Sequence, residues 1–185
     1  MRFVVPKISM ERAKKILPKR RRLSLGRKRE MRRLELLYLP YYLHRASVAQ
    51  GDDEHTVLAC TDGISSGFSF FDGAELELSD RVSGTALPFC VSLEESRRVC
   101  LENLRWHVLR QRSRFRGRAR VKELLESERI YYPYWVAYFK GRRGYDFRAA
   151  DAVTGTVQGV RMRAVFLTAF SQAGGENART VTAQN

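Results

Sequence analysis

Two aromatic segments of the chain carry the same pattern around a proline, and this recurrence constrains the fold more than any other feature. Residues 36–48 read LLYLPYYLHRASV and residues 130–139 read IYYPYWVAYF. Branched and aromatic residues of this density predict strands. Proline inside a strand belongs at an edge or a bulge. The matched positions are Tyr38, Pro40, Tyr41 and Tyr42 in the first segment and Tyr131, Pro133, Tyr134 and Trp135 in the second. Internal duplication explains this match, and it predicts equivalent edge or bulge positions for the two prolines.

Helical signals precede the first aromatic segment. Ser9 is a favourable N-cap, because its hydroxyl can accept a bond from an amide of the first helical turn. Pro18 and Gly26 interrupt the basic stretch that follows, so two short helices are expected instead of one long helix. Met31 and Leu34, spaced i, i+3, are assigned to the second of these helices.

Similar signals precede the second aromatic segment. Ser92, followed by Glu95 three residues later, has the pattern of a capping box. Apolar residues at helical spacing support a helix after this cap, and a further short helix is expected beyond it. The apolar positions are Leu101, Leu104 and Val108 in the first helix and Val121, Leu124 and Leu125 in the second.

Strand and turn signals follow each aromatic segment. Further strands are expected at residues 55–61, 68–79, 145–150 and 156–170, and turns at residues 62–67 (DGISSG) and 151–155 (DAVTG). The predicted fold class is α+β, with two tandem units related by a pseudo-two-fold axis, each a helix followed by antiparallel strands. The units span residues 1–83 and 84–170, and residues 171–185 are predicted to form a disordered tail.

The second unit resembles a PepSY-type module over residues 88–159. The resemblance is carried by the helix opened by Ser92-Leu93-Glu94-Glu95, by the aromatic strand, and by the turn Asp151-Ala152-Val153-Thr154-Gly155. The first unit is similar through its turn at Asp62–Gly67. The resemblance implies a non-catalytic module that faces a partner, with inhibition of peptidases as the role of some family members.

Positive charge is concentrated in the predicted helical segments. The formal net charge is +14, and residues 1–36 contribute +11, residues 37–93 contribute −6 and residues 94–129 contribute +5. Clustered arginines favour contact with phosphates, and an aromatic ring between them can stack on a base. The residues expected to bind a polyanion are Lys19, Arg20, Arg21, Arg22, Arg27, Lys28, Arg29, Arg110, Arg112, Arg114, Arg116 and Arg118. The residues considered for stacking are Phe115, Tyr134 and Trp135, although aromatic residues in strands more often belong to a sheet core.

These patterns predict a non-enzymatic basic protein that binds nucleic acid or another polyanion through its Arg-rich segments. The sequence leaves a second class open: a protein-interaction or assembly subunit, or a PepSY-like inhibitory module, that docks an acidic partner. Attachment to an anionic membrane surface ranks below both, because residues 14–33 have few apolar side chains on one face. Self-association into a homo-oligomer is also left open.

Motifs of catalysis, metal binding and membrane insertion are missing from the sequence. There is no Walker A loop and no G-x-G-x-x-G or G-x-S-x-G motif, so no catalytic residue and no cofactor are predicted. Cys90, Cys100 and His107 lack the close cysteine pair of zinc sites, so no metal is predicted. An odd count of three cysteines, with Cys60 as the third, indicates a reducing, cytoplasmic location. No apolar run approaches the roughly 20 residues of a transmembrane helix.

Overall fold

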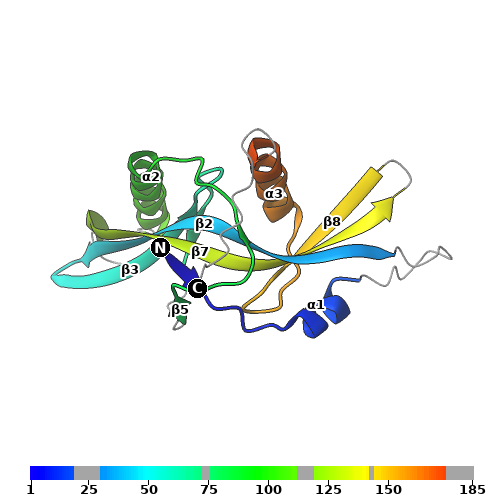
Figure 1. Ribbon diagram of the computed structural model, residues 1–185. Helices are drawn as coiled ribbons and strands as arrows, with labels where there is room; N and C mark the ends of the chain where they lie inside the picture. Colours follow the sequence, from blue (N-terminus) through cyan, green and yellow to red (C-terminus); the bar gives the residue numbers. More distant parts are fainter. Residues whose placement is uncertain (19–29, 72–75, 112–118, 142–143, 174–185) are drawn as a thin grey trace. The chain divides into compact units, whose positions relative to one another are not determined.

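The computed structural model describes residues 1–18, 30–71, 76–111, 119–141 and 144–173 (Figure 1). Its elements are β1 (Arg2–Val4), α1 (Met10–Ile16), β2 (Met31–Gln50), β3 (Asp53–Asp62), β4 (Phe68–Phe70), β5 (Leu78–Ser79), β6 (Thr85–Ala86), α2 (Leu93–Gln111), β7 (Ala119–Gly141), β8 (Gly144–Asp151) and α3 (Val160–Ala173). Strand accounts for 48% and helix for 26% of the structure, so the chain has α+β content.

The described strands form one mixed sheet, and this finding overturns the predicted fold class. The eight strands run in the order β4-β3-β2-β7-β1-β5, with β6 beside β2 and β8 beside β7. Two tandem helix-then-strand units were expected, and that expectation is wrong. The physical reason lies in β2 and β7, which have 20 and 23 residues, several times the usual strand length. Part of β2, residues 41–50, pairs with β3, while residues 37–38 pair in parallel with β6.

Two compact units share these long strands, and each unit draws on separate stretches of the chain. The first unit comprises Met1–Arg2, Pro40–Leu76 and Pro88–Ile130. The second comprises Phe3–Leu39, Glu77–Leu87 and Tyr131–Asn185. Consequently α2 shares a unit with the β2–β3 hairpin that precedes it, and α1 shares a unit with the distant β7–β8 hairpin. Each predicted helix therefore packs on a hairpin other than the one that follows it.

Three local assignments from the sequence are also corrected. Met31 and Leu34 begin β2 instead of lying in a helix, and both pack against the apolar cluster of the second unit. Leu124 is buried and Leu125 is exposed, which is the alternation of a strand, and both belong to β7. Residues 160–170, expected as strand, lie in α3, whose buried side chains Val165, Phe166 and Ala169 occupy one helical face.

Other local assignments are confirmed. Ser9 is the N-cap of α1, and its Oγ accepts a hydrogen bond from Arg12 N at 3.3 Å. Helix α2 runs over residues 93–111, and the Oγ of Ser92 accepts from Glu95 N at 3.2 Å. The expected strands at residues 55–61 and 145–150 lie within β3 and β8.

Pro40 and Pro133 have matching backbone contacts in the two hairpins. The carbonyl oxygen of Pro40 accepts from Gly63 N at 2.8 Å, and that of Pro133 accepts from Ala152 N at 3.1 Å. Both prolines are wholly buried. They lie in β2 and β7, which have neighbours on both sides in the sheet order, so neither proline is in an edge strand.

An aromatic side chain two residues after each proline binds the segment that leads into a helix. The hydroxyl of Tyr42 donates to the carbonyl of Val91 at 2.7 Å, directly before Ser92 and α2. The indole N–H of Trp135 donates to the carbonyl of Ile8 at 2.7 Å, directly before Ser9 and α1. Each helix start is thus tied to a hairpin by a buried or half-buried side-chain bond.

The second unit places helices on both faces of its strands (Figure 1). Tyr134 contacts Phe166 of α3 edge-on, with ring centroids 5.5 Å apart. Its neighbour Trp135 points the other way, into a cluster with Ala13 and Leu17 at α1. Successive strand residues face opposite sides of a sheet, so these two aromatics form part of two separate cores.

Candidate functional site

An exposed tryptophan on α2 stands next to an arginine one helical turn further along. Trp106 exposes 64% of its surface, although a ring of this size gains more than most side chains from burial. The guanidinium carbon of Arg110 lies 5.8 Å from the centre of the Trp106 ring, within the range of a cation–π contact. This pair is the centre of a site that we call the aromatic-basic surface. Its members are Phe68, Phe70, Asn103, Trp106, His107 and Arg110.

A shallow cavity of about 310 Å³ lies within the aromatic-basic surface, and the first unit alone forms it. The lining residues are Phe68, Asn103, Trp106, His107 and Arg110. The rings of Phe68 and Phe70 on β4 meet edge-on with centroids 5.2 Å apart. Phe70 in turn meets the His107 ring at 4.4 Å. A chain of edge-to-face contacts therefore fixes the ring positions beside the cavity.

The packing of α2 explains why these side chains face outward. Cys100 and Leu104 bury against Ala46 and Ala59 of the β2–β3 hairpin. Residues three or four apart share one face of a helix, and residues two apart do not. Trp106, two positions after Leu104, therefore lies off the face that packs on the hairpin.

Charge also changes along α2. Arg98 binds the carboxylates of Glu95 and Glu102, so the first half of the helix is locally balanced. Residues 103–122 contain eight Lys or Arg residues and no Asp or Glu. The aromatic-basic surface therefore lies at the start of a strongly positive stretch.

The structure places only some of the predicted binding residues. Arg110 belongs to the aromatic-basic surface. Tyr134 and Trp135 expose 6% and 7% of their surfaces and lie in the two cores of the second unit. The remaining predicted residues lie outside the described part of the chain, and they are Lys19, Arg20, Arg21, Arg22, Arg27, Lys28, Arg29, Arg112, Arg114, Phe115, Arg116 and Arg118.

Of the six residues of the aromatic-basic surface only Arg110 was predicted from the sequence, and the residues missed are Phe68, Phe70, Asn103, Trp106 and His107. A signal for Trp106 was present, because position 106 falls off the apolar face formed by Leu101, Leu104 and Val108. No comparable signal existed for Phe70, whose place beside α2 depends on how β4 pairs with β3.

A second group of polar residues, centred on His44, has the residue types of a catalytic site, but it is closed to substrate. Nδ1 of His44 lies 2.9 Å from Ser127 Oγ, and Nε2 lies 2.8 Å from Ser96 Oγ. Thr61 Oγ1 is 2.6 Å from Ser96 Oγ. Serine beside histidine is the arrangement of a nucleophile and its base. Here His44 and Ser96 are wholly buried, so the group ties β2, β3, α2 and β7 together inside the first unit.

Burial makes His44 an acid-sensitive element of the fold. Loss of hydration, with a smaller effect of Arg97, lowers the pKa of His44 to about 4. The unfolded chain protonates the imidazole near pH 6.5, so His44 contributes stability above this pH and loses it as the pH falls toward 4. We expect the free energy of unfolding to fall by about 3 kcal/mol over this window because of His44. Urea unfolding between pH 7 and 4.5 measures the loss.

The control for this prediction is the difference between two histidine variants. His44→Gln should be less stable at neutral pH but show a flatter dependence on pH between 6.5 and 4.5. His55→Gln, at an exposed position of β3, should keep the steeper dependence of the parent. The same slope in the parent and in His44→Gln contradicts the prediction.

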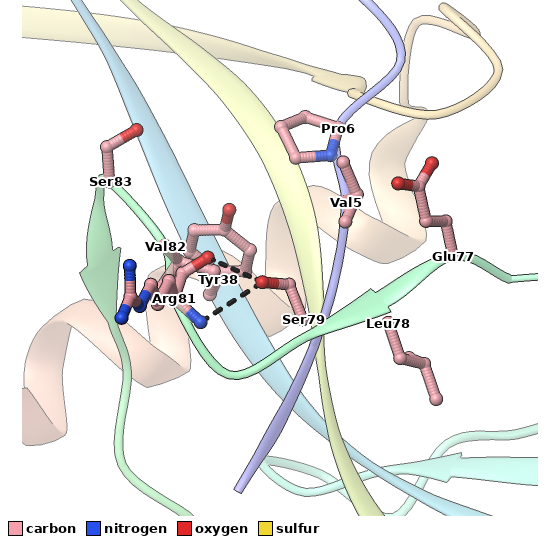
Figure 2. A pocket seen from close by; sticks show the side chains of 9 residues that line it. All are labelled: Val5, Pro6, Tyr38, Glu77, Leu78, Ser79, Arg81, Val82 and Ser83. Atoms are coloured by element: carbon pink, nitrogen blue, oxygen red, sulfur yellow. Dashed lines mark hydrogen bonds between the residues drawn. The ribbon is translucent and has the colours of Figure 1, made fainter.

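A cavity of about 390 Å³ in the second unit lacks a converging set of charged groups (Figure 2). Ser79 Oγ donates to Arg81 O at 3.0 Å and accepts from Arg81 N at 3.1 Å, so this hydroxyl holds its own loop. Figure 2 shows Glu77 and Arg81 on opposite sides of the lining. The complete lining is Val5, Pro6, Tyr38, Glu77, Leu78, Ser79, Arg81, Val82 and Ser83. A site for a specific ligand usually has a few polar groups that converge on the bound molecule, and the polar groups of this lining do not converge.

Among the described residues there is neither a cluster of metal ligands nor a helix that could span a membrane. No three His, Cys, Asp or Glu side chains of the described chain gather closely enough to hold a metal ion. Within the same residues, no helix has the length and apolar character needed to span a membrane.

Comparisons of the chain with protein-family models, curated proteins and solved structures found no match.

Proposed function

We propose that this protein is a non-enzymatic binding protein that contacts nucleic acid through the aromatic-basic surface and the Arg-rich stretch that follows α2 in the sequence. The observation that carries the proposal is the exposed Trp106 with Arg110 over its ring. Proteins that bind single-stranded nucleic acid combine positive charge along the backbone path with aromatic rings on which bases stack. The eight basic residues among positions 103–122 supply the positive charge.

The charge of the chain supports a phosphate-bearing partner. Arginine presents several N–H donors in a planar fork that matches two phosphate oxygens. Neutralised phosphates release bound counterions, so affinity falls with salt. Arg98 is already bound by Glu95 and Glu102, which leaves the second half of α2 as the positively charged end of the helix.

The test is a salt titration of a labelled single-stranded oligonucleotide, followed by fluorescence anisotropy. We expect log K to fall linearly with log salt concentration. A triple variant, Arg112→Ala with Arg114→Ala and Arg116→Ala, should weaken binding about ten-fold or more at low salt. It should also make the salt slope about two units shallower, because each lost phosphate contact contributes roughly 0.7.

A charge-matched control separates a local effect from a change in net charge. Arg45→Ala with Arg81→Ala and Arg161→Ala removes three positive charges from exposed positions outside the aromatic-basic surface. This variant should change affinity by less than about three-fold. Equal losses in the two triple variants contradict the proposed location, and absence of binding at low salt contradicts the function. Displacement of the oligonucleotide by polyglutamate at equal charge concentration favours the alternative function, the docking of an acidic protein.

A further inference from the structure

We infer that the cavity of the aromatic-basic surface receives one unstacked nucleobase, so that the protein prefers single-stranded to double-stranded nucleic acid. The inference rests on the proposed function and names the form of the partner. It uses only described residues of α2 and β4.

The aromatic lining suits the face of a flat, apolar ring. Phe68, Trp106 and His107 surround a cavity of about 310 Å³. Trp106 exposes 64% and Phe70 exposes 41% of their surfaces, so ring area is available without unfolding any element. Every base has a π-face, and stacking on an exposed indole is therefore tolerant of sequence.

The rings beside the cavity are already held in place. Phe70 bridges Phe68 and His107 through edge-on contacts at 5.2 and 4.4 Å. Side chains that are fixed before binding lose less conformational entropy when a ligand arrives. The edge-on chain thus favours binding of a ring against this wall.

Polar groups stand at the border of the cavity. The side-chain amide of Asn103 donates to the carbonyl of Val99 at 2.9 Å, which anchors the carboxamide where it lines the cavity. Its oxygen is an acceptor of the kind that pairs with the exocyclic amine of a base. Arg110, on the same lining, carries the charge that an adjacent phosphate requires.

A duplex cannot supply the same ligand. Bases inside a double helix are stacked on both faces, and only their edges are open in the grooves. Placing a base on Trp106 therefore requires a strand whose bases are free, as in single-stranded segments and loops.

Three labelled probes of one length test the inference: a 15-nucleotide single strand, the same backbone without bases, and the corresponding duplex. We expect the single strand to bind about ten-fold tighter than the abasic strand at equal salt, because only the former can stack. Binding of the single strand should also quench the emission of Trp106, while the buried Trp135 keeps its own.

Variants locate the effect. Trp106→Ala should reduce the advantage of the single strand over the abasic strand to less than about two-fold. Leu109→Ala, at an exposed position of the same helix outside the cavity lining, should keep the full advantage. Because Trp106 is exposed, its replacement leaves the core intact, and circular dichroism verifies this.

The outcomes separate the inference from the function on which it rests. Equal binding of all three probes with unchanged Trp106 emission overturns the base pocket and leaves nucleic-acid binding through phosphates intact. An advantage of the single strand that persists in Trp106→Ala also overturns the pocket. Failure of all three probes to bind at low salt overturns the pocket and the proposed function together.

Discussion

Asp62→Ala is expected to lower the free energy of unfolding by about 4 kcal/mol, the largest effect of any single substitution considered for this chain. Asp62 exposes only 4% of its surface. Its carboxylate accepts hydrogen bonds from the backbone amides of Ile64, Ser65 and Gly67, and also from the hydroxyl of Ser65. Alanine removes all four hydrogen bonds and leaves the amide of the buried Ile64 without its partner, while the amides of Ser65 and Gly67 belong to exposed residues. Urea unfolding at pH 7 measures the loss.

Two other aspartates, Asp151 and Asp52, serve as comparisons for the loss of stability expected at Asp62. Asp151 occupies the corresponding turn after β8 and accepts from the amides of Val153 and Thr154 and from the hydroxyl of Tyr132. It is less deeply buried, so Asp151→Ala should cost about half as much. Asp52 lies exposed in the β2–β3 turn, and Asp52→Ala should change stability by less than about 0.5 kcal/mol. Equal losses at Asp62 and Asp52 contradict the role assigned to the Asp62 turn.

Gly84→Ala is expected to lower the free energy of unfolding by about 3 kcal/mol. Gly84 has a φ of +145°, a conformation that residues with a Cβ rarely adopt. An added Cβ would lie 2.8 Å from the carbonyl oxygen of Leu36 and 2.9 Å from a ring carbon of Tyr38. Tyr38 is wholly buried and meets Phe3 edge-on at 5.3 Å, so the ring cannot move aside freely.

Two glycine controls divide this cost into its parts. Gly51 has a φ of +64° and no atom within 4 Å of an added Cβ, so Gly51→Ala measures backbone strain alone and should cost about 1 kcal/mol. Gly159 has neither a positive φ nor a close neighbour, and Gly159→Ala should be nearly neutral. If Gly84→Ala lowers the free energy of unfolding no more than Gly51→Ala does, then Leu36 and Tyr38 move to make room for the added Cβ. That result contradicts the prediction.

Local chemistry was readable from the sequence wherever the interaction spans a few residues. The cap at Ser9, the start of α2 at Ser92 and the hairpin turns after Asp62 and Asp151 depend on donors and acceptors two to five residues apart. Short-range hydrogen bonds of this kind form whichever distant segments pack against them.

The pairing of helices with hairpins was not readable, because it depends on contacts between distant residues. Ser9 and Ser92 carry similar cap signals, and nothing near either residue states which hairpin it will meet. The hydrogen bond from Trp135 to Ile8 joins residues 127 positions apart. The matched sequence around Pro40 and Pro133 is accompanied by matched backbone contacts, yet neither hairpin packs on the predicted helix that directly precedes it.

For the candidate site, too, some features could be predicted from the sequence and others depend on contacts between distant residues. The Arg-rich stretch was visible as composition, because net charge needs no fold. The exposure of Trp106 could be inferred from its place off the apolar face of α2, whereas the burial of Trp135 was not visible, because the sequence around it fits either a core or a stacking surface. Their difference comes from packing, which gives Trp135 a carbonyl partner and a core, and leaves Trp106 at the surface.

The contact between the start of the chain and Ala152 has a consequence for the order in which the protein can fold during synthesis. Lys7 and Ile8 both donate their amides to the carbonyl of Ala152. At about 5–20 residues per second, a ribosome needs about 7–30 s after making Ile8 before Ala152 exists. Cys90 and Val91, in contrast, emerge when their acceptor, Gly63, is already made. The segment leading into α1 therefore leaves the ribosome well before its acceptor Ala152, and in the interval chaperones and proteases can reach it.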